Sequence, residues 1–238
     1  MPTITLDALA ICLLPCLAIA WLGQRWAGGG WEMLRATGRM VVQLLVIGFA
    51  LVFLFETPDP WIGAAVVAVM IGVSALISVR VVKQGKRNAL VRAAIALGLG
   101  GGLVLAFILF AVLRLSDPVY QPRVIIPIAG MVFSNAMTAI TLATERFSSA
   151  TESGEGFDSA RRAAWTAALI PQVNALLAVG LVSLPGMMTG QILSGVDPLI
   201  AVRYQIVVMA MILQASGFSV AIFLWLSRPG GIRGPARP

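Results

Sequence analysis

The sequence predicts an all-α fold, a polytopic membrane helix bundle of about seven transmembrane helices, from its composition, its apolar runs and its charge distribution. Of the 238 residues, 59% are apolar and 11% are charged, whereas a soluble domain usually carries about 25% charged residues. A membrane-spanning helix needs roughly 20 predominantly apolar residues, and several runs approach that length. We therefore expect lipid to surround most of the chain.

Seven apolar runs are expected to span the membrane. The first has no Lys or Arg ahead of it, unlike the basic leading region of a secretory signal, so we expect it to remain as a helix. Aromatic residues at several ends, among them Trp61 and Trp225, are typical of the interfacial belt. The expected spans are Ala8–Leu22, Met40–Phe55, Trp61–Val79, Ala93–Leu113, Val124–Ala143, Ala164–Leu184 and Tyr204–Leu226.

The basic residues predict the orientation of these spans. With the N-terminus outside, only Arg114, Arg123 and Arg203 of the 17 basic residues lie on the outer side. Cytoplasmic loops are enriched in Lys and Arg, so the pattern favours an outer N-terminus and a cytoplasmic C-terminus. We expect a multi-pass protein of the plasma (inner) membrane.

One transmembrane domain is expected over residues 1–226, followed by a flexible cytoplasmic tail over 227–238. Two of its connections differ from short turns. The cytoplasmic segment 144–163 is long and mixes both charge signs. The outer segment 185–202 is Gly-rich and half apolar, too short to span, and is expected to form a re-entrant or interfacial helix.

The residues that are missing exclude several function classes. The chain has no His, and no Asp, Glu, Lys or Arg lies in the middle of an expected span. Carriers driven by protons or sodium generally keep an ionisable residue within the membrane, and a hydrolase needs a nucleophile with a base. With no Walker-type phosphate loop either, the chain is expected to be no enzyme and to hold no cofactor. Energy for uphill transport would come from another polypeptide.

Neutral polar residues gather on one face of the fifth span. Met131, Ser134 and Thr138 are spaced by three or four residues and so share a helix face. Such side chains either line a translocation path or join packed helices by hydrogen bonds, and the pattern leaves both open. The candidate path residues are Met131, Ser134, Asn135, Thr138, Asn174, Met187 and Met188.

Three backbone positions are candidate hinges. Pro171 lies inside the sixth span, where it removes a helix hydrogen bond and favours a kink. The kink is either a gating hinge or a packing bend. Pro185 and Gly186 open the outer segment and are the other two candidates.

The cytoplasmic segment 144–163 is the candidate docking surface for a partner, the alternative being a solvated linker. This interpretation rests on the charged side chains of the segment, because no other connection between the expected spans has as many residues of both charge signs. The candidate coupling residues are Glu145, Arg146, Asp158, Arg161 and Arg162.

Sulfur-containing side chains raise the question of a metal. Cys12 and Cys16 are four residues apart and share a helix face, while Met187 and Met188 adjoin in the outer segment. Thiols and thioethers suit soft metals, but free Cys and Met more often pack as apolar groups. No metal ligand is therefore assigned.

Several stretches carry a resemblance to a known family. Residues 122–143 read PRVIIPIAGMVFSNAMTAITLA, residues 168–174 read ALIPQVN, and residues 180–198 read GLVSLPGMMTGQILSGVDP. Together with residues 39–45 (RMVVQLL) and 201–209 (AVRYQIVVM), they resemble FetB/YbbM-type permeases over nearly the whole chain. Segment 148–160 is shorter than the corresponding loop of that family.

The resemblance implies the membrane subunit of an ABC transporter. It implies a homodimer that pairs with a separate FetA-like ATPase, which binds ATP and Mg. Bacterial members are linked to iron export, and plant relatives to aluminium tolerance and nucleotide-sugar transport. The expected function is export of iron or another metal ion. The alternatives are a non-metal substrate such as a nucleotide sugar, or a stand-alone channel or secondary transporter, and no nucleic-acid partner is expected.

Overall fold

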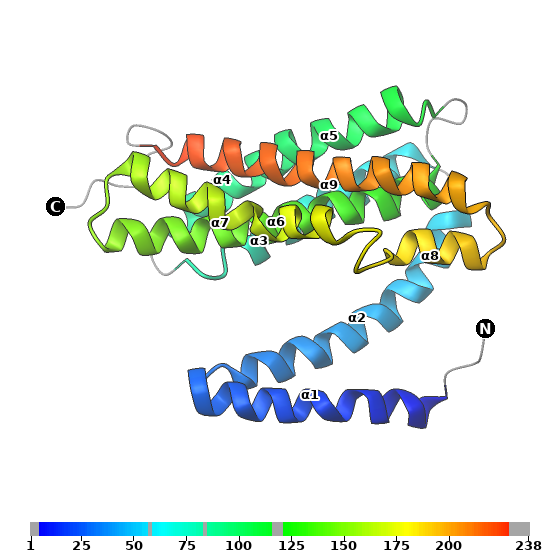
Figure 1. Ribbon diagram of the computed structural model, residues 1–238, viewed down its shortest axis with the longest axis horizontal. Helices are drawn as coiled ribbons and strands as arrows, with labels where there is room; N and C mark the ends of the chain where they lie inside the picture. Colours follow the sequence, from blue (N-terminus) through cyan, green and yellow to red (C-terminus); the bar gives the residue numbers. More distant parts are fainter. Residues whose placement is uncertain (1–4, 57–58, 83–84, 116–120, 229–238) are drawn as a thin grey trace. The chain divides into compact units, whose positions relative to one another are not determined.

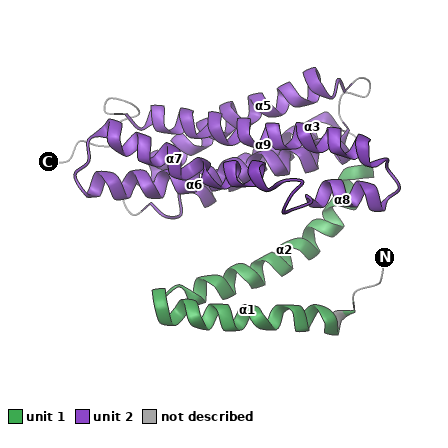
Figure 2. Ribbon diagram, viewed as in Figure 1, with its two compact units in different colours: residues 1–57 green, residues 58–238 purple. Residues whose placement is uncertain are grey.

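The computed structural model describes residues 5–56, 59–82, 85–115 and 121–228, and these form helices and short connections. Contacts between residues divide the chain into two compact units, residues 1–57 and residues 58–238 (Figure 2). Each unit is described by itself, and the single domain over residues 1–226 stays a prediction. The expected tail lies outside the described residues from Pro229 onward.

Unit 1 is a hairpin of two helices, α1 (Leu6–Ala27) and α2 (Gly30–Glu56) (Figure 1). Gly28 closes α1 with a left-handed φ of 69°, a conformation that glycine adopts without strain. The helices approach closely at the turn, because a Cβ on Gly30 would collide with the carbonyl oxygen of Ala20. Among the described side chains of this unit only these two positions are buried, so the two helices bury little of their apolar surface against each other.

Unit 2 contains the remaining helices, and two of them begin at an Asp-Pro pair. The Asp59 carboxylate accepts a hydrogen bond from the Trp61 amide at 2.8 Å, and Asp197 accepts one from the Leu199 amide at 2.8 Å. Asp at the N-cap followed by Pro is a favoured helix start. The helices of unit 2 are α3 (Pro60–Ser78), α4 (Lys86–Ala96), α5 (Gly102–Phe107), α6 (Pro122–Glu152), α7 (Phe157–Ala178), α8 (Gly186–Leu193) and α9 (Pro198–Leu226).

One long helix of unit 2, Lys86–Val112, contains both α4 and α5. One π-helical turn interrupts it at Leu97–Gly101, and a second ends it at Ile108–Val112. The first of these turns lies close against α9, since a Cβ on Gly100 would come 2.6 Å from the Ser219 backbone nitrogen. Glycine at this crossing therefore lets two helix backbones pack closely.

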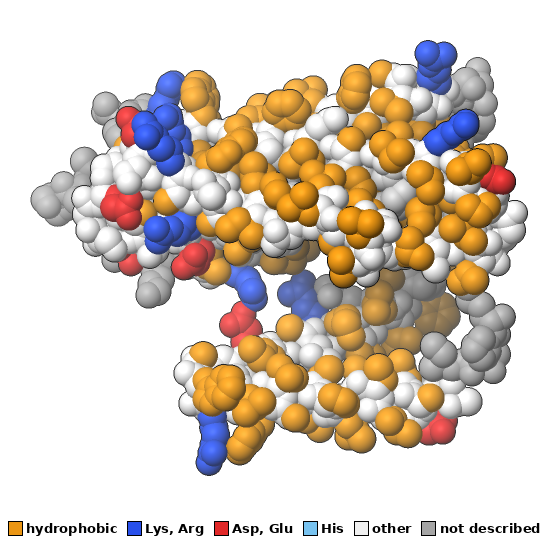
Figure 3. All heavy atoms as spheres, in the orientation of Figure 1, with side chains coloured by type: hydrophobic (Ala, Val, Ile, Leu, Met, Phe, Trp, Pro, Cys, Tyr) orange, Lys and Arg blue, Asp and Glu red, His pale blue; other side chains and the backbone are white. Residues whose placement is uncertain are grey.

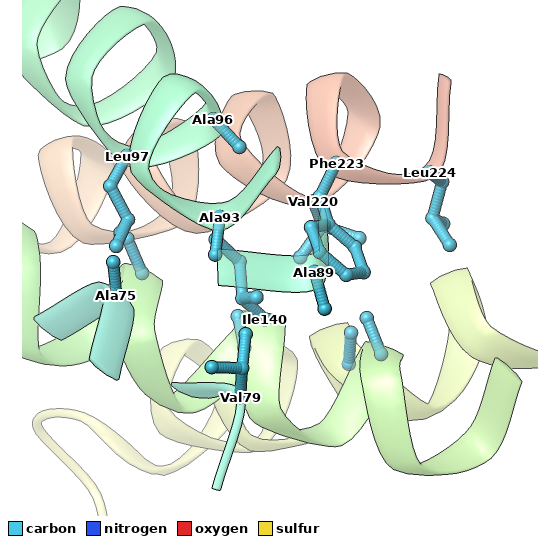
Figure 4. Packing of buried hydrophobic residues seen from close by; sticks show 14 of the residues in the cluster. Ala75, Val79, Ala89, Ala93, Ala96, Leu97, Ile140, Val220, Phe223 and Leu224 are labelled. Atoms are coloured by element: carbon cyan, nitrogen blue, oxygen red, sulfur yellow. The ribbon is translucent and has the colours of Figure 1, made fainter. Parts of the chain in front are cut away.

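α6 is the central helix of unit 2 and packs against α3, α7 and α9. Near its C-terminal half, a core cluster joins α3, α4, α6, α7 and α9, with Ile140 and Phe223 among its larger members (Figure 4). Near its N-terminal half, a second cluster surrounds Phe133 and Met211. The two clusters hold α6 along most of its length.

Six of the described helical stretches are long and apolar enough to cross a membrane, and they confirm a polytopic helix bundle. The predicted sixth span, Ala164–Leu184, is not among them. Its place is taken by α7, which begins earlier, at Phe157, and ends at Ala178. The apolar part of α7 is short because charged residues occupy its first turns, and because Gly180, with a φ of 80°, bends the chain after its end. The six stretches are Asp7–Ala27, Gly30–Glu56, Pro60–Ser78, Lys86–Val112, Pro122–Glu152 and Pro198–Leu226.

The surface of unit 2 has the charge distribution of a membrane protein. On the face that Figure 3 shows, Lys, Arg, Asp and Glu side chains gather at the two ends of this unit, and hydrophobic side chains cover the surface between them. An apolar band between polar ends is the expected surface of a protein that spans a bilayer.

Candidate functional site

The neutral polar residues of α6 lie partly on the surface of unit 2. Ser134 and Thr138 are exposed and Asn135 is half-buried. Asn174 on α7 is exposed too, and it is as many residues from the turn 153–156 as Asn135 is. Because α6 and α7 run antiparallel from this turn, Asn135 and Asn174 lie at a similar level along the hairpin.

The donors of this face bond to the backbone of their own helix. Asn135 Nδ2 donates to the Met131 carbonyl oxygen at 2.9 Å, and Thr138 Oγ1 donates to the Ser134 carbonyl oxygen at 3.0 Å. Ser134 Oγ donates to the Met131 carbonyl oxygen at 3.4 Å. These hydrogen bonds therefore do not join α6 to another helix, and the side-chain oxygens can still accept from a solute or from a second chain.

Two predicted path residues, Met131 and Met187, line one cavity of about 260 Å³ between α6, α8 and α9. A third methionine, Met211 of α9, and Tyr204 line it as well. Met188 is buried but does not line this cavity. The structure thus separates the predicted path residues into a methionine-lined cavity and an exposed polar face.

Buried amide oxygens are a feature that the sequence interpretation missed. Gln191 lines the methionine cavity, and its Oε1 is buried without a hydrogen-bond partner among the described residues. Gln172 and Gln205, only 4% and 5% exposed, also have an Oε1 without a partner there. An amide in an otherwise apolar span is a signal that could have identified Gln172 and Gln205.

The predicted docking segment 144–163 is mostly helical. α6 continues to Glu152 and α7 begins at Phe157, so only residues 153–156 form the turn. Gly154 has a φ of 83°, and the Glu155 amide donates to the Ala150 carbonyl oxygen at 3.0 Å, which is the hydrogen bond of a Schellman helix end. The segment is the tip of an α6/α7 hairpin rather than a linker.

Small and aromatic residues pack this hairpin near its turn. Ala160, Ala164 and Ala168 are spaced by four residues on α7 and are fully buried, and α7 packs mainly against α6. The rings of Phe147 and Phe157 meet edge to face with centroids 5.8 Å apart. Small residues let helix backbones approach closely, so the tip is a close-packed element.

All five predicted coupling residues are exposed on this hairpin. Glu145 and Arg146 lie on α6, and Asp158, Arg161 and Arg162 lie on α7. Arg161 pairs with Asp158 at 3.0 Å and its guanidinium lies 5.7 Å from the Phe157 ring centroid.

An open groove of about 500 Å³ adjoins the hairpin between α7 and α9. Arg161 and Arg162 line it together with Trp165 and Trp225. The groove beside the tip therefore presents Arg and Trp side chains together, two residue types that are enriched at protein interfaces.

The candidate hinges lie at the ends or on the outside of helices. Pro171 is exposed within α7, where its ring leaves the Ala167 carbonyl without the usual donor. Pro185 is the N-cap of α8 and Gly186 is its first residue. The segment 185–202 thus contains a short helix and the start of α9, and its depth in a membrane stays a prediction.

No resident metal site is evident in the part of the chain that the structure describes. There, no three His, Cys, Asp or Glu side chains come together. Cys12 and Cys16 are both free thiols, the first exposed and the second half-buried. Three methionines, Met131, Met187 and Met211, line one cavity of unit 2, and thioethers suit soft metals.

Comparison with known proteins gives consistent matches over most of the chain. A family described as "Uncharacterised protein family (UPF0014)" matches residues 5–157 and 151–229. A UPF0014 membrane protein of Synechocystis is 34% identical over 216 residues, which cover 84% of this chain and 82% of the relative.

Two further relatives carry more specific names. The "Probable iron export permease protein FetB" of Escherichia coli is 32% identical over 212 residues, 82% of this chain and 80% of the relative. "Protein ALUMINUM SENSITIVE 3" of Arabidopsis thaliana is 32% identical over 217 residues, 83% of this chain and 76% of the relative. No solved structure matches the chain significantly.

Proposed function

The chain belongs to the UPF0014 family of membrane proteins, and from that membership we propose that it is the permease subunit of an ABC transporter that exports a metal ion, iron foremost. The name of the Escherichia coli relative supports both the permease role and the cargo. The observation that carries the proposal is the α6/α7 hairpin. It bears exposed charges at its turn and neutral polar side chains farther along.

The proposed arrangement has seven spans, with α7 and the segment to Leu184 as the sixth. The N-terminus is outside and the C-terminus is cytoplasmic, because this orientation leaves only Arg114, Arg123 and Arg203 on the outer side. α6 has 31 residues and is therefore about 46 Å long, longer than the roughly 30 Å of hydrocarbon. Its last turns then project into the cytoplasm.

A separate FetA-like ATPase docks on this projecting tip. ATP and Mg bind to that subunit, and the coupling residues Glu145, Arg146, Asp158, Arg161 and Arg162 contact it. The tip is close-packed through Ala160 and Ala164, so a displacement at the turn moves α6 and α7 together. Such a rigid-body shift carries Asn135 and Asn174 with it and switches the path between its two openings.

The path lies where two copies of the chain meet. Ser134, Thr138 and Asn174 are exposed on unit 2, and polar groups are costly to expose to hydrocarbon. Facing a second copy across a water-filled path removes that cost. The homodimer then supplies the two membrane halves that two ATPases require.

The side chains that the cargo meets along the path are uncharged. Amide and hydroxyl oxygens of α6 and α7 hold a cation more weakly than carboxylates would, and so do the thioethers of Met131 and Met187 in the separate cavity between α6, α8 and α9. Conduction requires binding that is weak enough for the ion to leave. Neutral ligands therefore suit an exporter of a metal ion such as iron.

Cellular iron content tests this proposal. Cells without their own exporter are loaded with iron, and the iron retained is measured with the chain, with a FetA-like ATPase, and with both. We expect retention to fall only with both, and an ATPase whose Walker lysine is changed serves as the control. Equal iron loss with the chain alone would indicate a stand-alone channel, and no loss with both would remove iron as the cargo.

A further inference from the structure

A second cavity of unit 2, of about 280 Å³, lies between α4, α6 and α9. It is at the same end of the unit as the hairpin tip, since the C-terminal parts of α6 and α9 and the N-terminal part of α4 enclose it. None of its described lining residues carries a carboxylate. The polar lining residues are Asn88, Arg92, Thr144, Ser148, Thr151 and Ser227.

Thr144 is the residue that indicates a missing ligand. Its side chain is 4% exposed, and its Oγ1 has no hydrogen-bond partner among the described residues. Two other hydroxyls of the cavity are satisfied by their own helices: Thr151 Oγ1 donates to the Phe147 carbonyl at 2.9 Å and Ser227 Oγ donates to the Phe223 carbonyl at 2.8 Å. Buried hydroxyls nearly always have a partner, so Thr144 is suited to donate to a bound group.

The start of α4 faces the same cavity. Gly85 caps this 11-residue helix in a left-handed conformation, with a φ of 69° and no side-chain cap. Gly85, Asn88 and Arg92 follow helical spacing and all line the cavity. An uncapped helix N-terminus carries positive partial charge and its amides suit an anion.

The chemistry of the lining selects an anion over a cation. The half-buried Arg92 guanidinium repels cations and can bind two oxygens of a phosphate at once. The Asn88 amide and the Thr144 hydroxyl add neutral donors. Hydroxyl oxygens alone could hold a cation, but in this cavity they lie beside the Arg92 guanidinium and the positive N-terminal end of α4.

We propose that this cavity binds a phosphate group at the cytoplasmic membrane surface. The group is carried either by an anionic phospholipid headgroup or by free phosphate, since both present the same oxygens. Basic pockets between helices on that side commonly hold such headgroups. A bound phosphate bridges α4, α6 and α9 beside the tip of the hairpin and so steadies the last turns of α6, which carry the coupling residues Glu145 and Arg146.

Binding by the purified full-length chain in neutral detergent tests the proposal. Native mass spectrometry titrates phosphatidylglycerol, with the zwitterionic phosphatidylcholine, whose phosphate is neutralised by its own ammonium group, as the comparison, and thermal shift titrates inorganic phosphate. The variants are Arg92→Gln and Thr144→Val. The controls are Thr141→Val, whose hydroxyl donates to its own helix at Met137, and Arg203→Gln, which is exposed on α9.

We expect phosphatidylglycerol to bind in preference to phosphatidylcholine. Its affinity should fall about tenfold in Arg92→Gln and about threefold in Thr144→Val, because a charged and a neutral hydrogen bond are lost. Both controls should bind as the unaltered chain does. Without ligand, Thr144→Val should keep or raise the melting temperature, since it removes an unsatisfied hydroxyl, and this distinguishes a binding role from a structural one.

The two sources of phosphate give different results. Reduced lipid binding in the variants assigns the cavity to a headgroup, whereas reduced phosphate-dependent stabilisation alone assigns it to free phosphate. If Arg92→Gln does not fold, Thr144→Val decides. Unchanged binding of both ligands in the variants that fold, or equal binding of the two lipids, would overturn the proposal.

Discussion

The two ends of α7, the second helix of the α6/α7 hairpin, are packed in opposite ways. Near the turn, Ala150, Ala160 and Ala164 are at most 1% exposed and the Phe147 and Phe157 rings are in contact. Farther from the turn, Pro171, Asn174 and Leu177 of α7 are exposed, and α7 ends at Ala178. The part near the turn is a close-packed stem. The C-terminal part of α7, with the polar residues Ser134, Asn135 and Thr138 of α6, forms a wall that unit 2 does not bury.

This difference assigns two roles to two parts of the hairpin: one part transmits the motion of the ATPase, and the other contacts the transported solute. A close-packed stem passes on a displacement because packed interiors are dense and hardly compressible. An uncovered wall with neutral polar groups can face a solute. On this account, changes in the stem should disturb folding and docking, and changes in the wall should disturb transport alone.

The largest effect is expected from overpacking the stem with Ala164→Leu. Ala164 is fully buried, so a larger side chain forces α7 away from neighbouring helices and costs about 1–3 kcal/mol of unfolding free energy. The melting temperature in detergent should fall and ATPase co-purification should be lost. Ala175→Leu, at an exposed residue of α7, is the matched change in the wall, and an equal loss of stability there would refute the comparison.

A smaller but specific effect is expected at the tip. Arg161→Glu or Arg162→Glu reverses an exposed charge. The contacts that Arg161 loses, to Asp158 and the Phe157 ring, lie at the surface and exposed ion pairs contribute little, so the melting temperature should stay close to that of the unaltered chain. ATPase co-purification should decrease at least about tenfold, because an opposed charge at an interface costs more than one lost ion pair. Arg203→Glu, on α9, should leave co-purification unchanged. Undiminished co-purification in both tip variants would remove the tip as the docking surface.

The smallest change is expected in the wall, from Asn135→Leu. This residue is half-buried and its amide bonds only to its own helix, so the fold should tolerate leucine. Transport should fall about three- to tenfold because a polar ligand of the path is lost, while ATPase docking and dimer formation persist. Normal transport would exclude Asn135 from the path.

The long apolar helices were predictable because length and hydropathy alone identify them. The residues at which these helices begin and end were harder to predict. Residues 144–152 contain Thr, Ser and Glu, which suggested a connection, yet they continue α6 because Ala150 is buried and Phe147 packs on Phe157. Tertiary packing decided the helix end against local composition.

The candidate site was predictable only where its residues are close in sequence. The 3–4 spacing placed Ser134 and Thr138 on one face of α6, and the structure keeps them exposed. The methionine cavity could not be foreseen as a whole, because Met211 and Gln191 reach Met131 from two other helices. Contacts of that kind follow from the fold and leave no trace in sequence spacing.

The central claim is that uphill transport needs an ATPase on the hairpin tip. The most direct measurement is iron transport in proteoliposomes that contain the chain with or without a FetA-like ATPase, under ATP or under an imposed proton or sodium gradient. We expect accumulation against a concentration difference only with ATPase and ATP together. Accumulation driven by an ion gradient with the chain alone would contradict the account.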